Sequence, residues 1–163
     1  MIQTVSKDIE WEAAHRLING YPGNCKNNHG HSWKATVVLM LHPGGYHLNN
    51  FGFVRDFSDF KPLKQWVMDN WDHATLVSNN DKTMLKFLKA GKQRHYVFGT
   101  NPTSEHIAIV LMNQASNMLN DERTKVVEVR IRETCTSEAV VKYDAKDDGT
   151  WQDFQLAHRR RYE

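Results

Sequence analysis

Several segments of the chain alternate apolar and polar residues, as strands with one buried face do. The first carries its apolar residues at Val5, Ile9, Trp11 and Ala13, and the second at Trp33, Ala35, Val37, Leu39 and Leu41. We predict a third strand over residues 51–57, reached through a turn at His42-Pro43-Gly44-Gly45. Near the end, Val127, Val129 and Ile131 alternate with charged residues, and Ala139, Val141 and Tyr143 follow as the expected hairpin partner.

Two other segments have the spacing of amphipathic helices. Phe60, Leu63, Trp66 and Val67 form an apolar stripe after Ser58-Asp59, which we expect to cap the helix, with Pro62 in its first turn. The second stripe follows the helix-start signal Asn101-Pro102-Thr103 and consists of Ala108, Leu111, Met112, Ala115 and Leu119. A shorter helix is predicted over residues 81–89, ended by Gly91. This order predicts an α+β fold, an antiparallel sheet with two helices on one face.

Composition narrows the class of protein without naming a function. The 163 residues fit a single domain over 1–163, with a core of about 1–143 and a charge-rich C-terminal extension over 144–163 that we interpret as a solvated tail rather than an anion-binding segment. The net charge is +2, from 21 Lys+Arg and 19 Asp+Glu. This charge is too balanced to indicate a nucleic-acid or membrane partner, and we expect neither. No apolar run approaches a membrane span, and the first twelve residues do not resemble a signal peptide. Two cysteines make no disulfide framework, so we expect a cytoplasmic protein.

The densest chemistry lies in Cys25-Lys26-Asn27-Asn28-His29-Gly30-His31. His29 and His31 point to one face at the start of the second strand, and His15 ends the first strand on the parity of its apolar residues. If these strands pair, three imidazoles converge, and three neutral imidazoles with one open position are the ligands of a catalytic zinc. Two alternatives remain open from the residues alone: ordinary histidines, or a closed structural site with Cys25 as the fourth ligand.

Three further candidates are weaker by themselves. In Asp72-His73, the carboxylate can fix the tautomer of the imidazole. The sequence agrees equally well with a histidine that only interacts with the dipole at the C-terminus of the preceding helix. Glu133 shares the parity of the buried residues of its strand and therefore needs a partner, either an arginine or a ligand with two adjacent donors. Glu105 lies in the first turn of a predicted helix, where the helix dipole favours a carboxylate whatever its function.

The chain resembles the 6-pyruvoyl-tetrahydropterin synthase / 6-carboxy-tetrahydropterin synthase family. The resemblance rests on six motifs, which occur in the family's order between about residues 5 and 143. They are Trp11-Glu12-Ala13-Ala14-His15-Arg16-Leu17, Cys25 with His29-Gly30-His31, Phe53-Val54-Arg55-Asp56-Phe57, Trp71-Asp72-His73, Asn101-Pro102-Thr103-Ser104-Glu105 and Glu133-Thr134-Cys135-Thr136. Trp11 stands where the family usually has phenylalanine, and the extension beyond Asp144 has no counterpart.

This resemblance implies the tunnelling fold, in which three subunits form a barrel and two trimers form a homohexamer. It implies Zn²⁺ held by His15, His29 and His31, with no organic cofactor. It implies a catalytic triad of Cys25, Asp72 and His73, in which a neighbouring subunit supplies the Asp-His pair. Glu133 then anchors the pterin, and Thr103, Ser104 and Glu105 lie near its ring.

The family has two branches, which share the substrate 7,8-dihydroneopterin triphosphate. One eliminates triphosphate to give 6-pyruvoyl-tetrahydropterin. The other gives 6-carboxy-tetrahydropterin, acetaldehyde and triphosphate for 7-deazaguanine (queuosine) synthesis. The short spacing from Cys25 to His29 and the Glu133-Thr134-Cys135-Thr136 motif resemble the second branch, since this loop is longer in the animal enzymes. We therefore expect a lyase of the second branch, with a non-enzymatic, zinc-stabilised assembly module as the alternative from another class.

Overall fold

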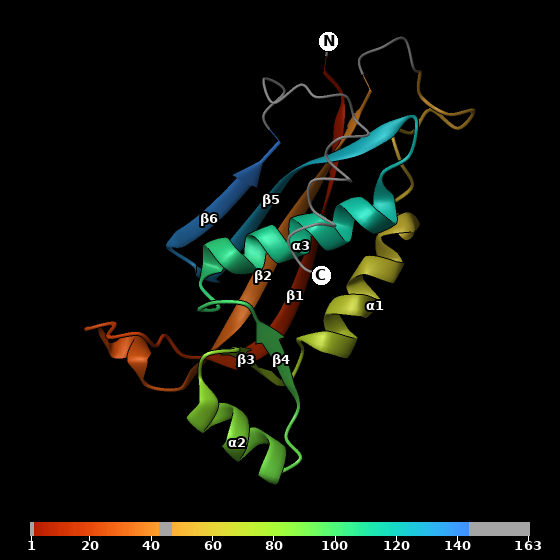
Figure 1. Cartoon of the computed structure of the whole chain (residues 1–163). Helices are drawn as coiled ribbons and strands as arrows, with labels where there is room; N and C mark the ends of the chain where they lie inside the picture. Colours follow the sequence, from red (N-terminus) through yellow and green to blue (C-terminus); the bar gives the residue numbers. More distant parts are fainter. Residues whose placement is uncertain (1, 43–46, 144–163) are drawn as a thin grey trace.

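A computed structural model describes residues 2–42 and 47–143 of the chain (Figure 1). The predicted turn at 42–45 lies largely outside these residues, and the C-terminal extension over 144–163 lies wholly outside them. The strands are β1 (Thr4–His15), β2 (His29–Leu41), β3 (Ala74–Ser78), β4 (His95–Phe98), β5 (Thr124–Thr134) and β6 (Ser137–Lys142). The helices are α1 (Lys61–Asn70), α2 (Lys82–Ala90) and α3 (Ser104–Leu119), with short 3₁₀ turns at Asn24–Lys26 and Phe57–Phe60.

The six strands form one sheet in the order β4-β3-β1-β2-β5-β6. The pairs β1/β2, β2/β5 and β5/β6 are antiparallel, as predicted. The two short strands differ from the prediction, because β3 lies parallel to β1 and β4 lies parallel to β3. Helix α2 connects β3 to β4, and such a crossover brings the chain back in the same direction. The sheet is therefore mixed.

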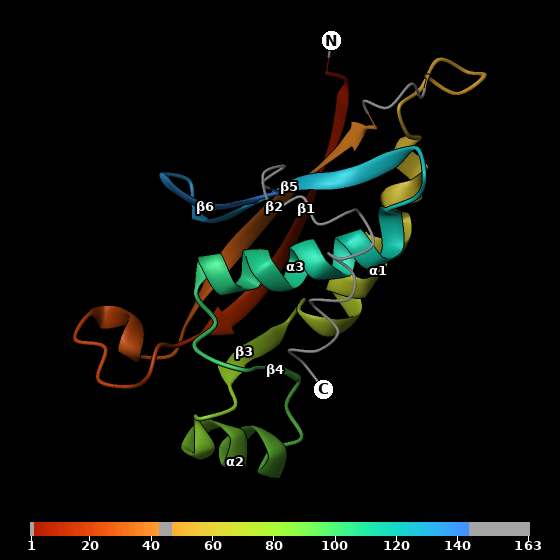
Figure 2. The ribbon, with the colours of Figure 1, turned by 45° about the horizontal axis from the view of Figure 1, so that its top comes forward.

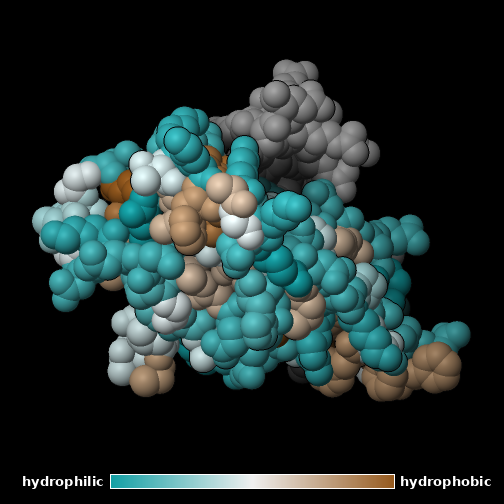
Figure 3. Space-filling model, turned by 90° about the horizontal axis from the view of Figure 1, so that it is seen from below, coloured by the Kyte–Doolittle hydropathy of each residue, from teal (hydrophilic) through white to brown (hydrophobic). Residues whose placement is uncertain are grey.

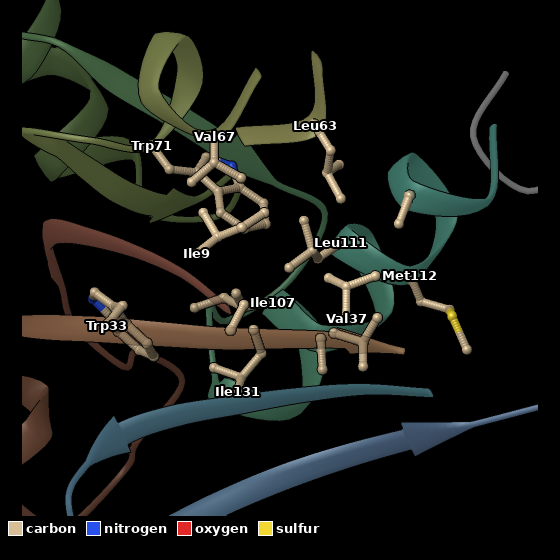
Figure 4. Close-up of a cluster of buried hydrophobic side chains, with 14 of the residues drawn as sticks. Ile9, Trp33, Val37, Leu63, Val67, Trp71, Ile107, Leu111, Met112 and Ile131 are labelled. Atoms are coloured by element: carbon tan, nitrogen blue, oxygen red, sulfur yellow. The ribbon is translucent and has the colours of Figure 1, made fainter. Parts of the chain in front are cut away.

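Helices α1 and α3 cover one face of the sheet, and the hydrophobic core lies between them and the strands (Figures 1 and 2). The alternating positions predicted to be buried face this core, as Trp33 and Val37 of β2 show beside Ile107 and Leu111 of α3 (Figure 4). Helix α2 lies apart from this layer, at the end of the molecule formed by β3 and β4 (Figure 1). Viewed from that end, the surface is mainly hydrophilic with scattered apolar groups (Figure 3).

The helix boundaries agree with the local signals, with one exception. The Thr103 side chain caps α3 by accepting the N–H of His106, and Asp81 caps α2 by accepting the N–H of Met84, while Gly91 ends it. The predicted cap of α1 is wrong, because Ser58 and Asp59 lie inside the 3₁₀ turn before the helix, and Asp56 caps that turn instead.

The strand predicted over residues 51–57 is absent from the structure. The side-chain oxygen of Asn49 accepts the N–H groups of Phe51 and Phe53, and Gly52 adopts a φ of 83°. These contacts make a turn, which leaves the side chain of Phe51 82% exposed. The alternating apolar pattern of this segment was misleading because Asn49 satisfies its backbone locally.

A β-bulge changes which residues of β5 are buried. The pairing with β2 shifts between Val38 and Leu39, so that Val38 lies opposite Glu128 and Leu39 lies opposite Val126. Val126 is consequently buried in the core, whereas Val127, predicted to face it, is only partly buried. Val129 and Ile131 lie beyond the bulge and are buried as predicted.

Candidate metal centre and active site

The three candidate zinc ligands converge where β1 ends and β2 begins. The register pairs Ala13 with His31 and His15 with His29, so all three imidazoles lie on the core face of the sheet. Nε2 of His15 lies 3.1 Å from Nε2 of His29, and the His29 and His31 ring centroids are 4.8 Å apart. The predicted convergence of the three rings is therefore present.

Backbone carbonyls fix the tautomers of two of these histidines. Nδ1 of His15 donates to the carbonyl of Pro102 at 2.8 Å, and Nδ1 of His29 donates to the carbonyl of Asn27 at 2.8 Å. In the neutral imidazoles, both Nε2 atoms then carry lone pairs, and these lone pairs face each other. Such an arrangement is repulsive unless a proton or a cation lies between the two nitrogens. Carbonyl partners on the far nitrogen are typical of metal-binding histidines.

A carboxylate completes the cluster. Oε1 of Glu133, near the end of β5, lies 3.0 Å from Nε2 of His15 and 2.9 Å from Nε2 of His31. The Nε2 atom of His31 is buried, and Oε1 of Glu133 is the charged atom beside it. The ligand atoms of these four residues all lie within 4.8 Å of one another. Three imidazoles and a carboxylate are a donor set that suits Zn²⁺.

Burial favours the protonation state that a metal needs. It lowers the pKa of His15 and of His31, since a charged imidazolium is poorly solvated there. His15 is only 1% exposed, and the edge of its ring packs against Trp33 at a centroid distance of 5.0 Å. Burial thus favours the neutral form of His15 and of His31, which is the form that can bind a metal.

The segment before α3 organises the other side of the cluster. The carboxamide of Asn101 accepts the N–H of Ile18 at 3.0 Å and donates to the carbonyl of Ile18 at 3.3 Å. Pro102 supplies the carbonyl for His15, and the Ser104 hydroxyl donates to Oε2 of Glu133 at 3.1 Å. Thr103 caps α3, whereas Glu105 is exposed on its first turn and is not part of the four-residue cluster. Sequence reasoning marked this segment but missed the roles of Asn101 and of the Pro102 carbonyl.

Cys25 is not part of the four-residue cluster. Its free, half-buried thiol belongs to the 3₁₀ turn between β1 and β2, which is fastened by a hydrogen bond from the N–H of Leu17 to the carbonyl of Cys25 at 2.8 Å. The fourth member of the cluster is Glu133, not Cys25. The geometry thus disfavours a closed Cys-His₃ site.

Asp72 and His73 connect α1 to β3 and are held by the backbone of Glu12. Oδ1 of Asp72 accepts the N–H of Glu12 at 2.9 Å, and Oδ2 accepts Nδ1–H of His73 at 2.8 Å. The Glu12 N–H, and then the adjacent His73 ring, lower the pKa of Asp72. The His73 N–H donates to the Glu12 carbonyl at 2.7 Å, and His73 has a φ of 52°, in the left-handed region. The side chain of His73 is 76% exposed, so the imidazole is presented to solvent on a fixed support.

His73 borders a cavity of about 530 Å³. The polar residues of its wall include Glu12, Ser32 and Arg94, and His31 is also one of the residues that line it. Cys25 does not line it. In β1 and β2, the lining residues Glu12, Ala14, Gly30 and Ser32 alternate with the residues that carry the three imidazoles, so the cavity lies mainly against the opposite face of the sheet from the metal cluster.

Comparison with known proteins assigns the chain to a family. The family model for 6-pyruvoyl tetrahydropterin synthase matches residues 4–144. The chain belongs to this family. Its mixed sheet with two covering helices is accordingly the tunnelling fold.

Proteins named as tetrahydropterin synthases are similar to this chain along most of their length. A 6-carboxy-5,6,7,8-tetrahydropterin synthase of Rickettsia bellii is 30% identical over 132 residues, which cover 79% of this chain and 92% of the relative. A second, from Haemophilus influenzae, is 29% identical and covers 82% of this chain and 94% of the relative. The structure of Caenorhabditis elegans 6-pyruvoyl tetrahydropterin synthase aligns with a TM-score of 0.61 at 25% identity, covering 88% of this chain and 97% of that one. The tetrahydropterin synthase family implies a lyase-type enzyme that acts on a small pterin.

Proposed function

We propose that this protein is a zinc-dependent 6-carboxy-5,6,7,8-tetrahydropterin synthase. It converts 7,8-dihydroneopterin triphosphate to 6-carboxy-tetrahydropterin, acetaldehyde and triphosphate, in the cytoplasm, for 7-deazaguanine (queuosine) synthesis. The observation that carries the proposal is the cluster of three imidazoles and one carboxylate, with the two Nε2 atoms of His15 and His29 facing each other at 3.1 Å. The names of the Rickettsia and Haemophilus relatives support this branch of the family.

The residues of the cluster fit the metal in number, type and protonation. His15, His29 and His31 hold Zn²⁺ through Nε2, and this leaves a position open toward the substrate. Zinc, when bound there, polarises the side-chain oxygens of the substrate. Trp33 and the carbonyls of Pro102 and Asn27 keep the rings oriented.

Glu133 anchors the pterin, in line with the resemblance. A carboxylate can accept the adjacent 2-amino and N3 donors of the ring with its two oxygens, because each oxygen can accept more than one hydrogen bond. In the structure its Oε2 accepts from Ser104 and its Oε1 faces His15 and His31, so the same group stands between the metal ligands and the start of α3. Thr103, Ser104 and Glu105 then lie around the ring. This geometry supports a pterin bound with its side chain beside the metal.

Proton transfer falls to Cys25 and to the Asp72–His73 pair. The Cys25 thiolate removes a proton from the substrate side chain. Cys25 lies in the short loop before β2, four residues before the metal ligand His29 in the sequence. His73 relays protons, and Asp72 holds its Nδ1–H so that Nε2 faces outward. Because His73 is exposed, it is available to a neighbouring subunit.

The open edges of the sheet support a barrel-shaped oligomer. On the side facing β3, β1 pairs only through Ala13–His15, so in the described residues no strand lies beside Thr4–Glu12 there. β6 forms the opposite edge of the four antiparallel strands. Pairing β6 of one copy with β1 of the next would close these edges, which otherwise favour aggregation. We propose three copies in a barrel and two such trimers in a hexamer, which light scattering at micromolar concentration tests; a monomer would contradict it.

The second candidate is 6-pyruvoyl-tetrahydropterin synthase, which eliminates triphosphate from the same substrate. The family model and the C. elegans structure favour it. The shared residues serve either outcome, because the bond that breaks depends on which side-chain atoms are aligned with the acid and base.

Product analysis separates the candidates. The purified protein is incubated with 7,8-dihydroneopterin triphosphate, and acetaldehyde is measured by a coupled assay while the pterin is identified by mass spectrometry. We expect acetaldehyde and 6-carboxy-tetrahydropterin in equal amounts, and neither with the Cys25→Ala variant. Triphosphate release with a 6-pyruvoyl product would favour the second candidate. Absence of both turnover and pterin binding would favour a non-enzymatic assembly module.

A further inference from the structure

We infer that Arg94 is a positioning residue for the Asp72–His73 pair. The inference rests on the proposed function, in which this pair transfers protons. Arg94 lies between α2 and β4, more than twenty residues from the pair in sequence, and lines the same cavity as His73.

The side chain of Arg94 holds the end of the helix that leads to the pair. Its Nη2 donates to the carbonyl of Met68 at 2.9 Å and to the carbonyl of Asp69 at 2.9 Å. These carbonyls belong to the last turn of α1, where helical partners are missing and a cation is favoured by the helix dipole. Arg94 therefore fixes the backbone three residues before Asp72.

The backbone of Arg94 holds the chain on the other side of the pair. Its carbonyl accepts the N–H of Thr75 at 3.0 Å, two residues after His73. Arg94 thus forms hydrogen bonds to the chain both before and after Asp72–His73, and the backbone of Glu12 forms hydrogen bonds to Asp72 and His73 themselves.

The conformation of His73 explains why the segment needs this support. A non-glycine residue at a φ of 52° is disfavoured, so it is kept only where neighbouring contacts determine the backbone. If the end of α1 were released, the turn could relax and carry the imidazole away from its fixed direction. A displacement of about 1 Å at a catalytic group can cost up to about 100-fold in rate.

Arg94 also acts on the pair through its charge. The groups that face Asp72 are the Glu12 N–H, the His73 ring and the Arg94 guanidinium, and each stabilises the carboxylate. The other charged group on the cavity wall is the carboxylate of Glu12, which accepts from the Ser32 hydroxyl at 2.9 Å. Removal of the guanidinium charge should therefore raise the pKa of Asp72.

The test compares Arg94→Gln and Arg94→Lys with the parent in the full-length, zinc-loaded protein. Arg123→Gln is the matched control, because Nη2 of Arg123 also donates to a backbone carbonyl, that of His47, beyond the opposite end of β2. Three quantities are measured: kcat, KM for dihydroneopterin triphosphate, and the pKa of Asp72 by carboxyl NMR. Thermal unfolding verifies that each variant is folded.

We expect Arg94→Gln to lower kcat about 10-fold with KM unchanged within about twofold, and to raise the pKa of Asp72. Arg94→Lys should restore that pKa and most of the rate, and Arg123→Gln should change neither. A raised KM at unchanged kcat would overturn the inference, since Arg94 would then contact substrate. An unchanged kcat would overturn it as well.

The Asp72 titration also separates failure of this inference from failure of the proposed function. If the parent protein does not turn over the substrate, the proposed function fails. A raised pKa of Asp72 in Arg94→Gln would then still support the positioning contact, and an unchanged pKa would overturn it.

Discussion

Replacing Asn101 with alanine should weaken zinc binding by about 10-fold or more, because partners of metal-binding histidines typically contribute 10–100-fold to metal affinity. The hydrogen bonds that the side chain of Asn101 forms go to Ile18 and not to a proposed ligand. Its carboxamide clamps both backbone groups of Ile18, which follows His15 by three residues, and the next residue, Pro102, supplies the carbonyl that orients His15. Loss of the clamp should let this carbonyl move away from Nδ1 of His15.

The cost to stability follows from the two hydrogen bonds that are lost. At about 0.5–1.5 kcal/mol each, and with Ile18 partly accessible to water, the zinc-free protein should lose about 1–2 kcal/mol. For a chain of this length, that corresponds to a fall of roughly 2–8 °C in Tm. A tenfold loss of zinc affinity equals about 1.4 kcal/mol, so the two effects have similar size but appear in different measurements.

Asn120→Ala is the matched control at the other end of α3. The side-chain oxygen of Asn120 accepts the N–H of Val126 at 2.8 Å, so this variant also loses a bond between carboxamide and backbone, far along the sheet from the histidines. Zinc affinity is measured by competition with a chromophoric chelator, and stability by urea unfolding of the zinc-free protein. We expect both variants to lose stability and only Asn101→Ala to lose affinity. Equal zinc affinities in the two variants would refute the reasoning.

Four further outcomes are expected. His31→Ala should lose about 100-fold or more in zinc affinity, and a full zinc content by elemental analysis would reject it as a ligand. Cys25→Ala should retain zinc and pterin binding but lose at least about 100-fold in turnover, whereas loss of the metal would favour a Cys-ligated site. Glu133→Gln should keep zinc and lose affinity for a pterin analogue by calorimetry; the reverse would make Glu133 a metal ligand. Finally, the bidentate hydrogen bonds from Arg16 lower the pKa of Asp81 in the folded protein. The ionised Asp81 therefore stabilises the fold above the unfolded-state pKa of about 3.9, and this stabilisation is lost as the pH falls through the folded-state pKa. Urea midpoints of the parent and Asp81→Asn should therefore differ at pH 6, and the difference should shrink as the pH falls through the folded-state pKa of Asp81; a difference that does not shrink in acid would contradict this.

The local patterns of the sequence determined much of the fold and part of the site. Alternation placed the core positions of β1 and β2, and the residues before α3 predicted where that helix begins. Parity alone predicted that the three histidines share one face, because side chains of a strand alternate strictly and antiparallel pairing joins the end of β1 to the start of β2. The parity of Glu133 indicated the same face.

The remaining features depend on contacts between segments that lie far apart along the chain, which no local pattern records. The bulge opposite Val38 decided that Val126, rather than Val127, is buried. The side chain of Asn49 accepts the N–H groups of Phe51 and Phe53, so these residues form a turn instead of the strand expected over residues 51–57. Only the folded chain brought the Pro102 carbonyl to His15, and Arg94 to the end of α1, because hydrogen bonds to backbone carbonyls depend on position in space and not on the identity of the residue that supplies them.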